Sequence, residues 1–209
     1  MRLVLASNNA KKLAELQALF TGLPIDLVSQ GSLGITEADE PHATFIENAL
    51  AKARHAAQAS GLPAIADDSG LCVAALGGAP GVQSAVYAGV VVGVGDREGQ
   101  RRAQDAANNA LLLKRMHGVA DRRARFVSTL VAVRHAADPE PLCASGRWEA
   151  TLLAAPRGSA GFGYDPLVWI DALGASVAEL NAQQKNTISH RALAAQSLRG
   201  LMGRAWQLG

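Results

Sequence analysis

The sequence predicts an α/β protein built on a mixed β-sheet flanked by helices. Short apolar strand patterns alternate along the chain with segments whose apolar residues recur at helical spacing. Two longer strand patterns, 125–134 and 142–153, are joined by a connection around Pro139 and Pro141 that is too short for a crossover helix. We therefore expect these two strands to pair antiparallel within an otherwise alternating α/β chain.

The first half of the chain supplies two strand–helix units. Residues 2–6 form a short apolar strand, and the helix after it is indicated by apolar residues at helical spacing, Leu13, Leu16, Leu19 and Phe20. A second strand lies near 25–29. The next helix is predicted over 44–60 with Gly61 at its end, and its apolar face is formed by Ile46, Ala49, Leu50 and Ala53.

The second half adds one long helix, the antiparallel pair and a C-terminal helix. After a Gly/Pro-rich loop at 77–81 and an apolar Gly/Val segment through Gly95, a helix is predicted over 97–117, which Asp96 caps and Gly118 ends. A last strand over 166–170 precedes a polar stretch and then a helix over 189–207. No repeat or linker interrupts the chain, so residues 1–209 are expected to form one domain.

Composition excludes several classes of protein. The 209 residues are 49% apolar, which is enough for a packed core, with room for two lobes sharing one sheet. A net charge of +2 argues against a nucleic-acid surface that depends on many phosphate contacts. No apolar run approaches the roughly 18 residues of a membrane span, and the N-terminus is unlike a signal peptide, so we expect a cytoplasmic protein. Cys72 and Cys143 lie in apolar sequence without metal-ligand spacing and are expected to be buried thiols.

The most informative segment is a pair of carboxylates, Asp67 and Asp68, at the end of the apolar run 62–66. An ionised side chain is costly to desolvate, so a buried strand that runs into two of them indicates a cation or a reacting water. Because side chains alternate along a strand, one carboxylate can hold a metal while the other addresses water. Asp-Asp-Ser-Gly is equally common as turn and cap sequence, and this segment alone leaves both interpretations open.

Three further segments carry polar groups suited to an anionic ligand. Lys12 lies in the 7–12 loop before the first helix, where free backbone N–H groups favour a phosphate, although a capped helix start with a solvated lysine is the commoner explanation of such a segment taken alone. The side chains of Thr44, Asn48 and Lys52 form a stripe on the 44–60 helix that can offer an ammonium group or can simply be a solvated face. Glu40 can join Asp67 as an oxygen ligand for magnesium.

Two later loops carry side chains suited to binding a flat aromatic ring such as a base. The segment 161–166 places two aromatic residues and an acid between glycines in a chain with only 4% aromatic content, which favours stacking on a base. The segment 185–191 gathers donors at a helix start that can bond a carbonyl or a phosphate. Both segments can also be ordinary turn and capping sequence, and His190 can be a residue of a helix's first turn.

Together these segments closely resemble the inosine/xanthosine triphosphate pyrophosphatases, enzymes that hydrolyse abnormal purine nucleoside triphosphates. The resemblance spans almost the whole chain, in the blocks 7–12, 44–49 with Lys52, 66–71, 77–82, 161–166 and 189–191. It implies an α/β fold with a mixed sheet and two lobes around a central cleft, and a homodimer. It also implies that water attacks the α-phosphorus of dITP, ITP or XTP, which releases pyrophosphate and leaves the monophosphate.

The resemblance also implies roles for individual residues. Glu40 and Asp67 match ligands of a magnesium cofactor (Mg²⁺), and Asp68 matches the carboxylate beside the metal that activates water. The predicted triphosphate contacts are Ser7, Asn9, Lys12 and Lys52, with Ser69 beside the acidic pair. The predicted contacts to the base and the residues that close over the nucleotide are Phe162, Gly163, Tyr164, Asp165, Lys185, His190 and Arg191.

The chain departs from the family pattern at a few positions. Val86 stands where the family usually has arginine, Asn8 and Ala160 replace frequent glycines, and 90–95 is unusually apolar. Two alternatives therefore stay open. One is a protein that binds inosine triphosphate with magnesium and hardly hydrolyses it. The other is a broader phosphatase similar to the Maf-like pyrophosphatases, which would also cleave pyrimidine triphosphates.

Overall fold

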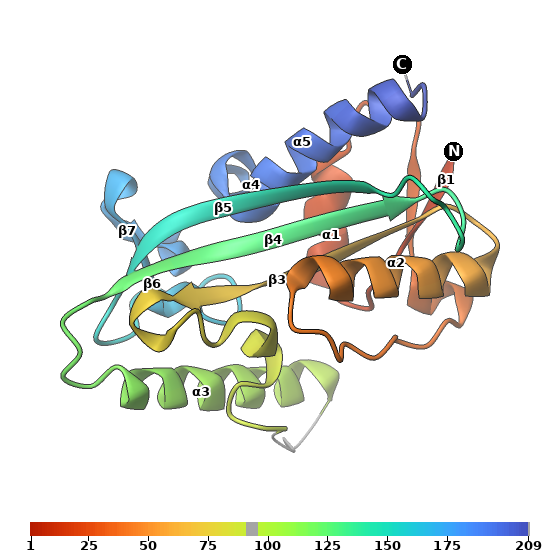
Figure 1. Ribbon diagram of the computed structural model, residues 1–209. Helices are drawn as coiled ribbons and strands as arrows, with labels where there is room; N and C mark the ends of the chain where they lie inside the picture. Colours follow the sequence, from red (N-terminus) through yellow and green to blue (C-terminus); the bar gives the residue numbers. More distant parts are fainter. Residues whose placement is uncertain (91–95, 209) are drawn as a thin grey trace. The chain divides into compact units, whose positions relative to one another are not determined.

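A computed structural model describes residues 1–90 and 96–208 of the chain (Figure 1). The predicted apolar loop at 90–95 therefore lies, except for Val90, outside the described residues. The chain divides into two compact units. Unit 1 comprises Met1–Asp68, Ser128–Arg147 and Asn186–Gly209, and unit 2 comprises Ser69–Val127 and Trp148–Lys185. Three of the four boundaries between the units fall inside strands β3 (Ala64–Val73), β4 (Arg123–Val133) and β5 (Leu142–Leu152).

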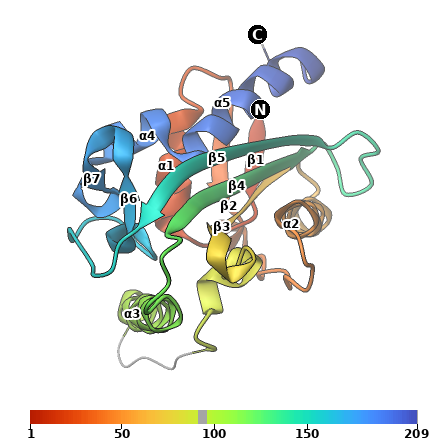
Figure 2. The same cartoon turned by 60° about the vertical axis from the view of Figure 1, so that its left-hand side comes forward.

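The described strands form one mixed sheet with the order β2-β1-β3-β4-β5-β6-β7. Strand β1 (Arg2–Leu5) pairs parallel with β2 (Asp26–Ser29) and with β3. Strand β6 (Val168–Ile170) pairs antiparallel with β5 and with β7 (Ala175–Ser176). Strands β4 and β5 are neighbours and lie side by side in both views (Figures 1 and 2). The predicted mixed α/β sheet is thus confirmed.

Unit 1 packs helices on both faces of its strands because β1 is apolar on both sides. Leu3 and Leu5 pack with α1 (Ala10–Leu19) and α5 (His190–Ala205), whereas Val4 packs with α2 (Phe45–Ser60). Figure 2 shows α2 on one side of the strands and α1 with α5 on the other. The two apolar layers are centred on Leu3, Leu5, Leu16, Leu130 and Leu198 in the first and on Val4, Ala49, Ala53, Ala66 and Val131 in the second.

The predicted helices begin and end close to the capping residues identified in the sequence. The Thr44 hydroxyl accepts from the backbone N–H of Glu47 at the start of α2, and Gly61 ends that helix in the left-handed conformation at φ 67°. Helix α3 (Arg97–Arg115), in unit 2, is capped by the Asp96 side chain as expected. It ends two residues before the predicted His117, and Gly118 follows with a φ of 72°.

Unit 2 contains α3, β6, β7 and most of the short helices. The 3-10 helices of this unit are η2 (Ala74–Leu76), η3 (Gly81–Val86), η4 (Asp165–Leu167), η5 (Asp171–Leu173) and η6 (Val177–Glu179), while η1 (Gln30–Leu33) belongs to unit 1. Helix α4 (Ala182–Ile188) crosses a unit boundary within the segment predicted only as a polar stretch. None of the helices among the described residues is long and apolar enough to span a bilayer.

Three expectations from the sequence are wrong. Ile46, predicted on the apolar face of α2, is 47% exposed. Strand β3 does not end at the acidic pair; it continues to Val73, with Leu71 and Val73 fully buried. Cations of the same unit neutralise the two carboxylates, so their burial does not stop the strand. The cysteines are not buried thiols: Cys72 is half-buried and Cys143 is exposed. In β5 buried and exposed residues alternate, and Cys143 falls on the exposed set.

Candidate functional site

The residues predicted for the site form two groups, one within each unit. Unit 1 holds Ser7, Asn9, Lys12, Glu40, Lys52, Asp67, Asp68, His190 and Arg191. Unit 2 holds Ser69, Phe162, Gly163, Tyr164, Asp165 and Lys185. The first group is dominated by carboxylates and cations, and the second by an aromatic loop.

Asp67 is the best-paired carboxylate of unit 1. It is 1% exposed, and its Oδ2 accepts from Arg191 Nε and Nη2 at 3.1 and 2.9 Å. Lys12 Nζ lies 3.0 Å from the same oxygen, and the Ser128 hydroxyl donates to Oδ1 at 2.7 Å. Burial by itself raises the pKa of Asp67, but Arg191 and Lys12 outweigh it and hold that pKa well below its usual range. Asp67 is therefore a permanent anion.

Arg191 is committed to carboxylates. Its remaining Nη1 donates to Glu15 of α1, and the side chain is almost completely buried. In this arrangement Arg191 is the counter-ion of Asp67, and its predicted contact to a base stays a prediction. Neither Glu15 nor Ser128 stood out in the sequence. The only signal for Glu15 is its place three residues after Lys12 on the same helix.

Lys52 joins the two remaining carboxylates of unit 1. Its Nζ lies 3.0 Å from Glu40 Oε1 and 3.0 Å from Asp68 Oδ1, and it also donates to the Asp67 carbonyl at 3.2 Å. Burial alone lowers the pKa of Lys52, but Asp68 and Glu40 outweigh it and raise that pKa. Burial, with Glu40 adding to it, raises the pKa of Asp68 despite Lys52. The second Asp68 oxygen, Oδ2, is buried and accepts no hydrogen bond from the described residues.

The polar stripe of α2 is not a solvated face. Asn48 is fully buried and bonds both backbone groups of His42, at 3.0 and 3.3 Å, so it fixes the chain just after Glu40. Thr44 caps the helix, and Lys52 is 7% exposed. The stripe thus holds the Glu40 segment and supplies the ammonium group.

The loop before α1 is both a helix cap and a holder of Lys12. Asn9 Oδ1 accepts from the backbone N–H groups of Lys11 and Lys12, and the Asn9 N–H donates to Ser7 Oγ at 3.2 Å. The capping interpretation is confirmed for Asn9. The solvated lysine is not, because Lys12 Nζ is turned to Asp67, and burial lowers its pKa. Phosphate binding by Ser7 and Asn9 stays a prediction.

The donors of unit 1 fit a divalent cation at one place. Among residues 1–90 and 96–208, no three His, Cys, Asp or Glu side chains are grouped to hold a metal ion. Glu40 and Asp68 nevertheless share one cation already, the Lys52 ammonium, and Asp68 Oδ2 is a buried oxygen with no donor among these residues. Hard oxygen atoms of this kind suit magnesium. Asp67 fits less well, because Arg191, Lys12 and Ser128 occupy its carboxylate.

In unit 2 the predicted stacking loop is organised around Asp165. Its Oδ2 accepts from Lys185 Nζ at 2.9 Å and from the Phe162 N–H at 3.0 Å. Lys185 Nζ also lies 4.5 Å from the centre of the Phe162 ring. Gly161 has a φ of 81°, and a Cβ there would lie 2.1 Å from Asp165 Oδ2, so glycine alone fits. Phe162, Asp165 and Lys185 therefore lie together, and their contacts to a base stay predictions.

Tyr164 has a structural role in this arrangement. It is 4% exposed, and its hydroxyl donates to the Ser84 carbonyl at 2.9 Å. Ser84 Oγ in turn accepts from the Leu71 N–H and donates to the Gly81 carbonyl, which ties β3 to η3. Ser69 follows Asp68 in β3 and is half-buried, and His190 is the buried first residue of α5. The nucleotide contacts predicted for these three side chains stay predictions.

Sequence reasoning missed a row of α3 residues that contact the stacking loop. Asp105 accepts from the Gly163 N–H at 2.9 Å, and Asn109 donates to the Gly163 carbonyl at 3.0 Å. The Arg101 guanidinium lies 5.3 Å from the centre of the Phe162 ring. These residues are spaced i, i+4 and i+8, which is the signal that could have found them.

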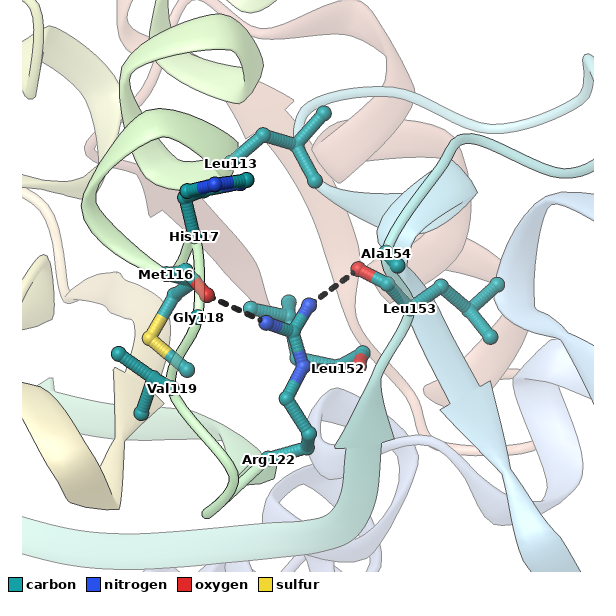
Figure 3. Close-up of a pocket in the computed structure, with 9 residues that line it drawn as sticks. All are labelled: Leu113, Met116, His117, Gly118, Val119, Arg122, Leu152, Leu153 and Ala154. Atoms are coloured by element: carbon teal, nitrogen blue, oxygen red, sulfur yellow. Dashed lines mark hydrogen bonds between the residues drawn. The ribbon is translucent and has the colours of Figure 1, made fainter.

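A cavity of about 440 Å³ at the end of α3 is separate from these residues (Figure 3). It is lined mainly by Leu113, Met116, His117, Arg122, Leu152 and Leu153. Figure 3 shows that Arg122 crosses it to reach the carbonyls of Met116 and Leu153. No predicted site residue lines the cavity.

Comparison with known proteins decides the family. The model of the Ham1 family matches residues 3–201. The chain belongs to the Ham1 family. A Ham1 relative from Methylibium petroleiphilum, named dITP/XTP pyrophosphatase, is 69% identical over 206 residues and 99% of both chains. A Burkholderia pseudomallei protein with the same name is 59% identical over 97% of this chain and 93% of its own.

Solved structures of Ham1 proteins share the fold. The HAM1 protein of Coxiella burnetii superposes with a TM-score of 0.87 at 40% identity and covers 98% of this chain and 100% of its own. The Ham1 protein of Staphylococcus aureus gives a TM-score of 0.82 at 33% identity, covering 97% and 98%. The α/β fold inferred from the sequence is therefore the Ham1 fold.

Proposed function

We propose that this Ham1 chain is a nucleoside triphosphate pyrophosphatase that hydrolyses dITP, ITP and XTP to the monophosphate and pyrophosphate. Its similarity to relatives named dITP/XTP pyrophosphatase extends over 99% of both chains in the Methylibium case. The structural observation that carries the proposal is the buried Asp68 carboxylate, which has one oxygen on Lys52 and a second oxygen that accepts no hydrogen bond within residues 1–90 and 96–208. A carboxylate held in this way can accept a proton from water.

Magnesium is the proposed cofactor, and Glu40 and Asp68 are the residues that would hold it. When bound, magnesium neutralises phosphate charge and lowers the pKa of a nearby water. Asp67 is the other predicted ligand, and its commitment to Arg191 and Lys12 makes it better suited to fixing the position of those cations. Asp68, the next residue in β3, then presents its carboxylate from a rigid strand.

The proposed reaction divides its tasks among residues of this chain. Asp68 takes a proton from the water whose oxygen bonds to the α-phosphorus, while the bond from that phosphorus to the bridging oxygen breaks and pyrophosphate leaves. Lys12 and Lys52, both largely buried, offset the negative charge of the departing group, and the Ser7–Asn9 loop supports Lys12. Phe162 offers a ring on which the base stacks, and Asp165 holds its loop.

Selectivity for hypoxanthine and xanthine has a simple physical basis. A site whose donors point at the 6-carbonyl leaves them unpaired against the 6-amino group of adenine. Unpaired buried donors are costly, so adenine nucleotides bind less well. The second group of residues, around Phe162, Asp165 and Lys185, is the proposed place for this recognition.

Phosphorus NMR of the purified protein with magnesium tests the proposal. Each of ITP, dITP, XTP, GTP, ATP and CTP is incubated separately, and the phosphorus products are identified. The expected result is pyrophosphate and monophosphate from the first three, with the others nearly untouched. Orthophosphate release would overturn the mechanism. Cleavage of all six would favour the broad phosphatase, and binding without turnover would favour a nucleotide-binding protein impaired by Val86.

A homodimer and a cytoplasmic location also belong to the proposal. Both rest on the resemblance between this chain and the pyrophosphatase family. Size-exclusion chromatography with light scattering distinguishes a dimer from the 21.7 kDa monomer. A single species at the monomer mass would overturn the dimer.

A further inference from the structure

Two cations lie over the Phe162 ring, and they are held very differently. Lys185 Nζ is 4.5 Å from the ring centre, and the Arg101 guanidinium carbon is 5.3 Å from it. Lys185 is anchored by an ion pair with Asp165, in which both side chains are less than 10% exposed. Arg101 makes neither an ion pair nor a hydrogen bond with any residue in 1–90 and 96–208. A base that stacks on the side of Phe162 where Arg101 lies displaces that arginine, which, unlike Lys185, has no ion pair among these residues to break.

The backbone around Phe162 holds Arg101 in register with the ring. Gly163, next in sequence, donates to Asp105 and accepts from Asn109, at 2.9 and 3.0 Å. Asp105 and Asn109 lie one and two helical turns after Arg101 on the same face of α3. The helix therefore fixes the loop at two points and places Arg101 beside the ring at a third. The side chain that leaves the ring face remains next to the edge of a stacked base.

Arg101 also has the chemistry that a keto purine requires. A planar guanidinium donates two parallel hydrogen bonds to the 6-carbonyl oxygen and N7 of a purine, an edge that adenine presents with an amino group instead. The other arginine predicted to contact the base, Arg191, donates to Asp67 and Glu15 through all three of its nitrogens. Arg101 has no hydrogen-bond acceptor among residues 1–90 and 96–208, so its N–H groups can donate to a base beside Phe162.

We propose that Arg101 is a base-contacting residue that gives up its place on Phe162 to the base and donates to O6 and N7 of hypoxanthine or xanthine. The inference rests on the proposed function and deepens it, since it names the group that selects 6-keto purines. It assigns a specificity role to a residue of α3 that no sequence motif marked.

Kinetics of Arg101→Gln on ITP and ATP test this assignment, with Arg102→Gln as the matched control. Arg102 is the exposed neighbour on the same helix, so it loses the same charge without the ring contact. In Arg101→Gln the KM for ITP should rise about 5- to 150-fold, the range for one bidentate purine contact, with kcat within about twofold. The preference for ITP over ATP should fall by a similar factor. Arg102→Gln should match the wild type, and Arg101→Lys should be intermediate because it lacks the planar fork.

A modified substrate isolates the proposed contact. 7-deaza-dITP lacks the N7 acceptor. With this substrate Arg101→Gln should raise KM by a smaller factor than with dITP, and the logarithm of that factor should be at most half as large. An undiminished penalty would overturn the bidentate contact. Equal KM values for ITP in Arg101→Gln and Arg102→Gln would overturn the role altogether.

The test separates this inference from the proposed function. If the wild type binds ITP without cleaving it, the proposed hydrolysis fails. The ratio of ITP dissociation constants for Arg101→Gln and Arg102→Gln, measured by calorimetry, then decides the inference by the same 5- to 150-fold criterion. If the wild type neither binds nor cleaves ITP, both are overturned.

Discussion

Arg191 and Asp67 form a buried ion pair between positions 124 residues apart, with Arg191 Nε and Nη2 3.1 and 2.9 Å from Asp67 Oδ2. The pair joins the start of α5 to the middle of β3 within unit 1. Both side chains are 2% exposed or less, so neither charge can be satisfied by water if the other is removed. The pair therefore fixes the first of the two adjacent carboxylates.

Removing one partner of this pair should destabilise the protein strongly. Arg191→Met leaves the buried Asp67 carboxylate without its arginine partner, and we expect a loss of about 3–5 kcal/mol in the free energy of unfolding. Urea denaturation measures it, with Arg204→Met, an exposed residue of the same helix, as the control. A loss below about 1 kcal/mol in Arg191→Met would mean that the pair does not hold Asp67.

Asp68→Asn should separate binding from turnover. The amide keeps the size of the side chain but cannot accept the proton of water, so kcat should fall about 10²- to 10⁴-fold. The dissociation constant for ITP measured without magnesium should change little. The control is Asp39→Asn, an exposed carboxylate close in sequence to Glu40, which should leave kcat unchanged. Unchanged turnover in Asp68→Asn would remove Asp68 from its role as the base.

Asn8 and Gly31 should be energetically coupled. A Cβ at Gly31 would lie 2.4 Å from Asn8 Oδ1, an oxygen that is itself buried and accepts no hydrogen bond from the described residues. The new methyl group forces the Asn8 side chain to turn away, so Gly31→Ala should cost about 0.5–1.5 kcal/mol in the wild type, the range for a displaced rotamer. In the Asn8→Ala background the same change should cost much less. Equal costs in the two backgrounds, measured by urea denaturation, would contradict the contact.

Asp138 should make stability depend on pH in the acid range. The Arg134 side chain bonds it, and backbone N–H groups of Arg134 and Glu140 also donate to it; together they hold the pKa of Asp138 well below 3.8. A group whose pKa is lower in the folded state stabilises above its unfolded pKa and loses that effect as pH falls through its folded pKa. Asp138→Asn should therefore cost about 1–2 kcal/mol at pH 7 and progressively less below pH 4.

Asp121→Asn provides the control for that experiment. Asp121 is also bonded by an arginine, but its side chain is 37% exposed, whereas that of Asp138 is fully buried. Surface pairs contribute little to stability, so this variant should unfold close to the wild type at every pH. A constant difference between Asp138→Asn and the wild type from pH 7 to pH 3 would show that Asp138 contributes through packing instead.

The elements that sequence reasoning located are those with local signals. Helix α2 has an apolar face, a Thr44 cap and a terminal Gly61, and it forms almost where predicted. Helix α4 was missed because its seven residues contain a single large apolar side chain, Ile188. The length of β3 beyond Asp68 was missed because a strand's end depends on its neighbours in the sheet and on the cations that neutralise its carboxylates.

The candidate site likewise has features that the sequence predicts and features that depend on the fold. The residue types follow from motifs that the sequence displays, but pairs such as Lys52 with Asp68 or Lys185 with Asp165 do not. Which carboxylate receives which cation does not follow. Asp67 and Asp68 are adjacent and identical in sequence terms, yet Arg191 and Lys12 take one and Lys52 takes the other.

By itself the sequence determined the α/β alternation, the helix ends and the acidic pair with its lysines, because hydrophobic periodicity and caps act over a few residues. Only the tertiary structure decided that Arg191 binds Asp67, that Tyr164 bonds the backbone of Ser84, and that Arg101 rests on Phe162. These contacts form between segments that are distant in the chain. The folded backbone decides which helix ends and strand faces come together, and this decides which side chains meet. The spacing of two residues along the chain does not indicate their distance in the fold.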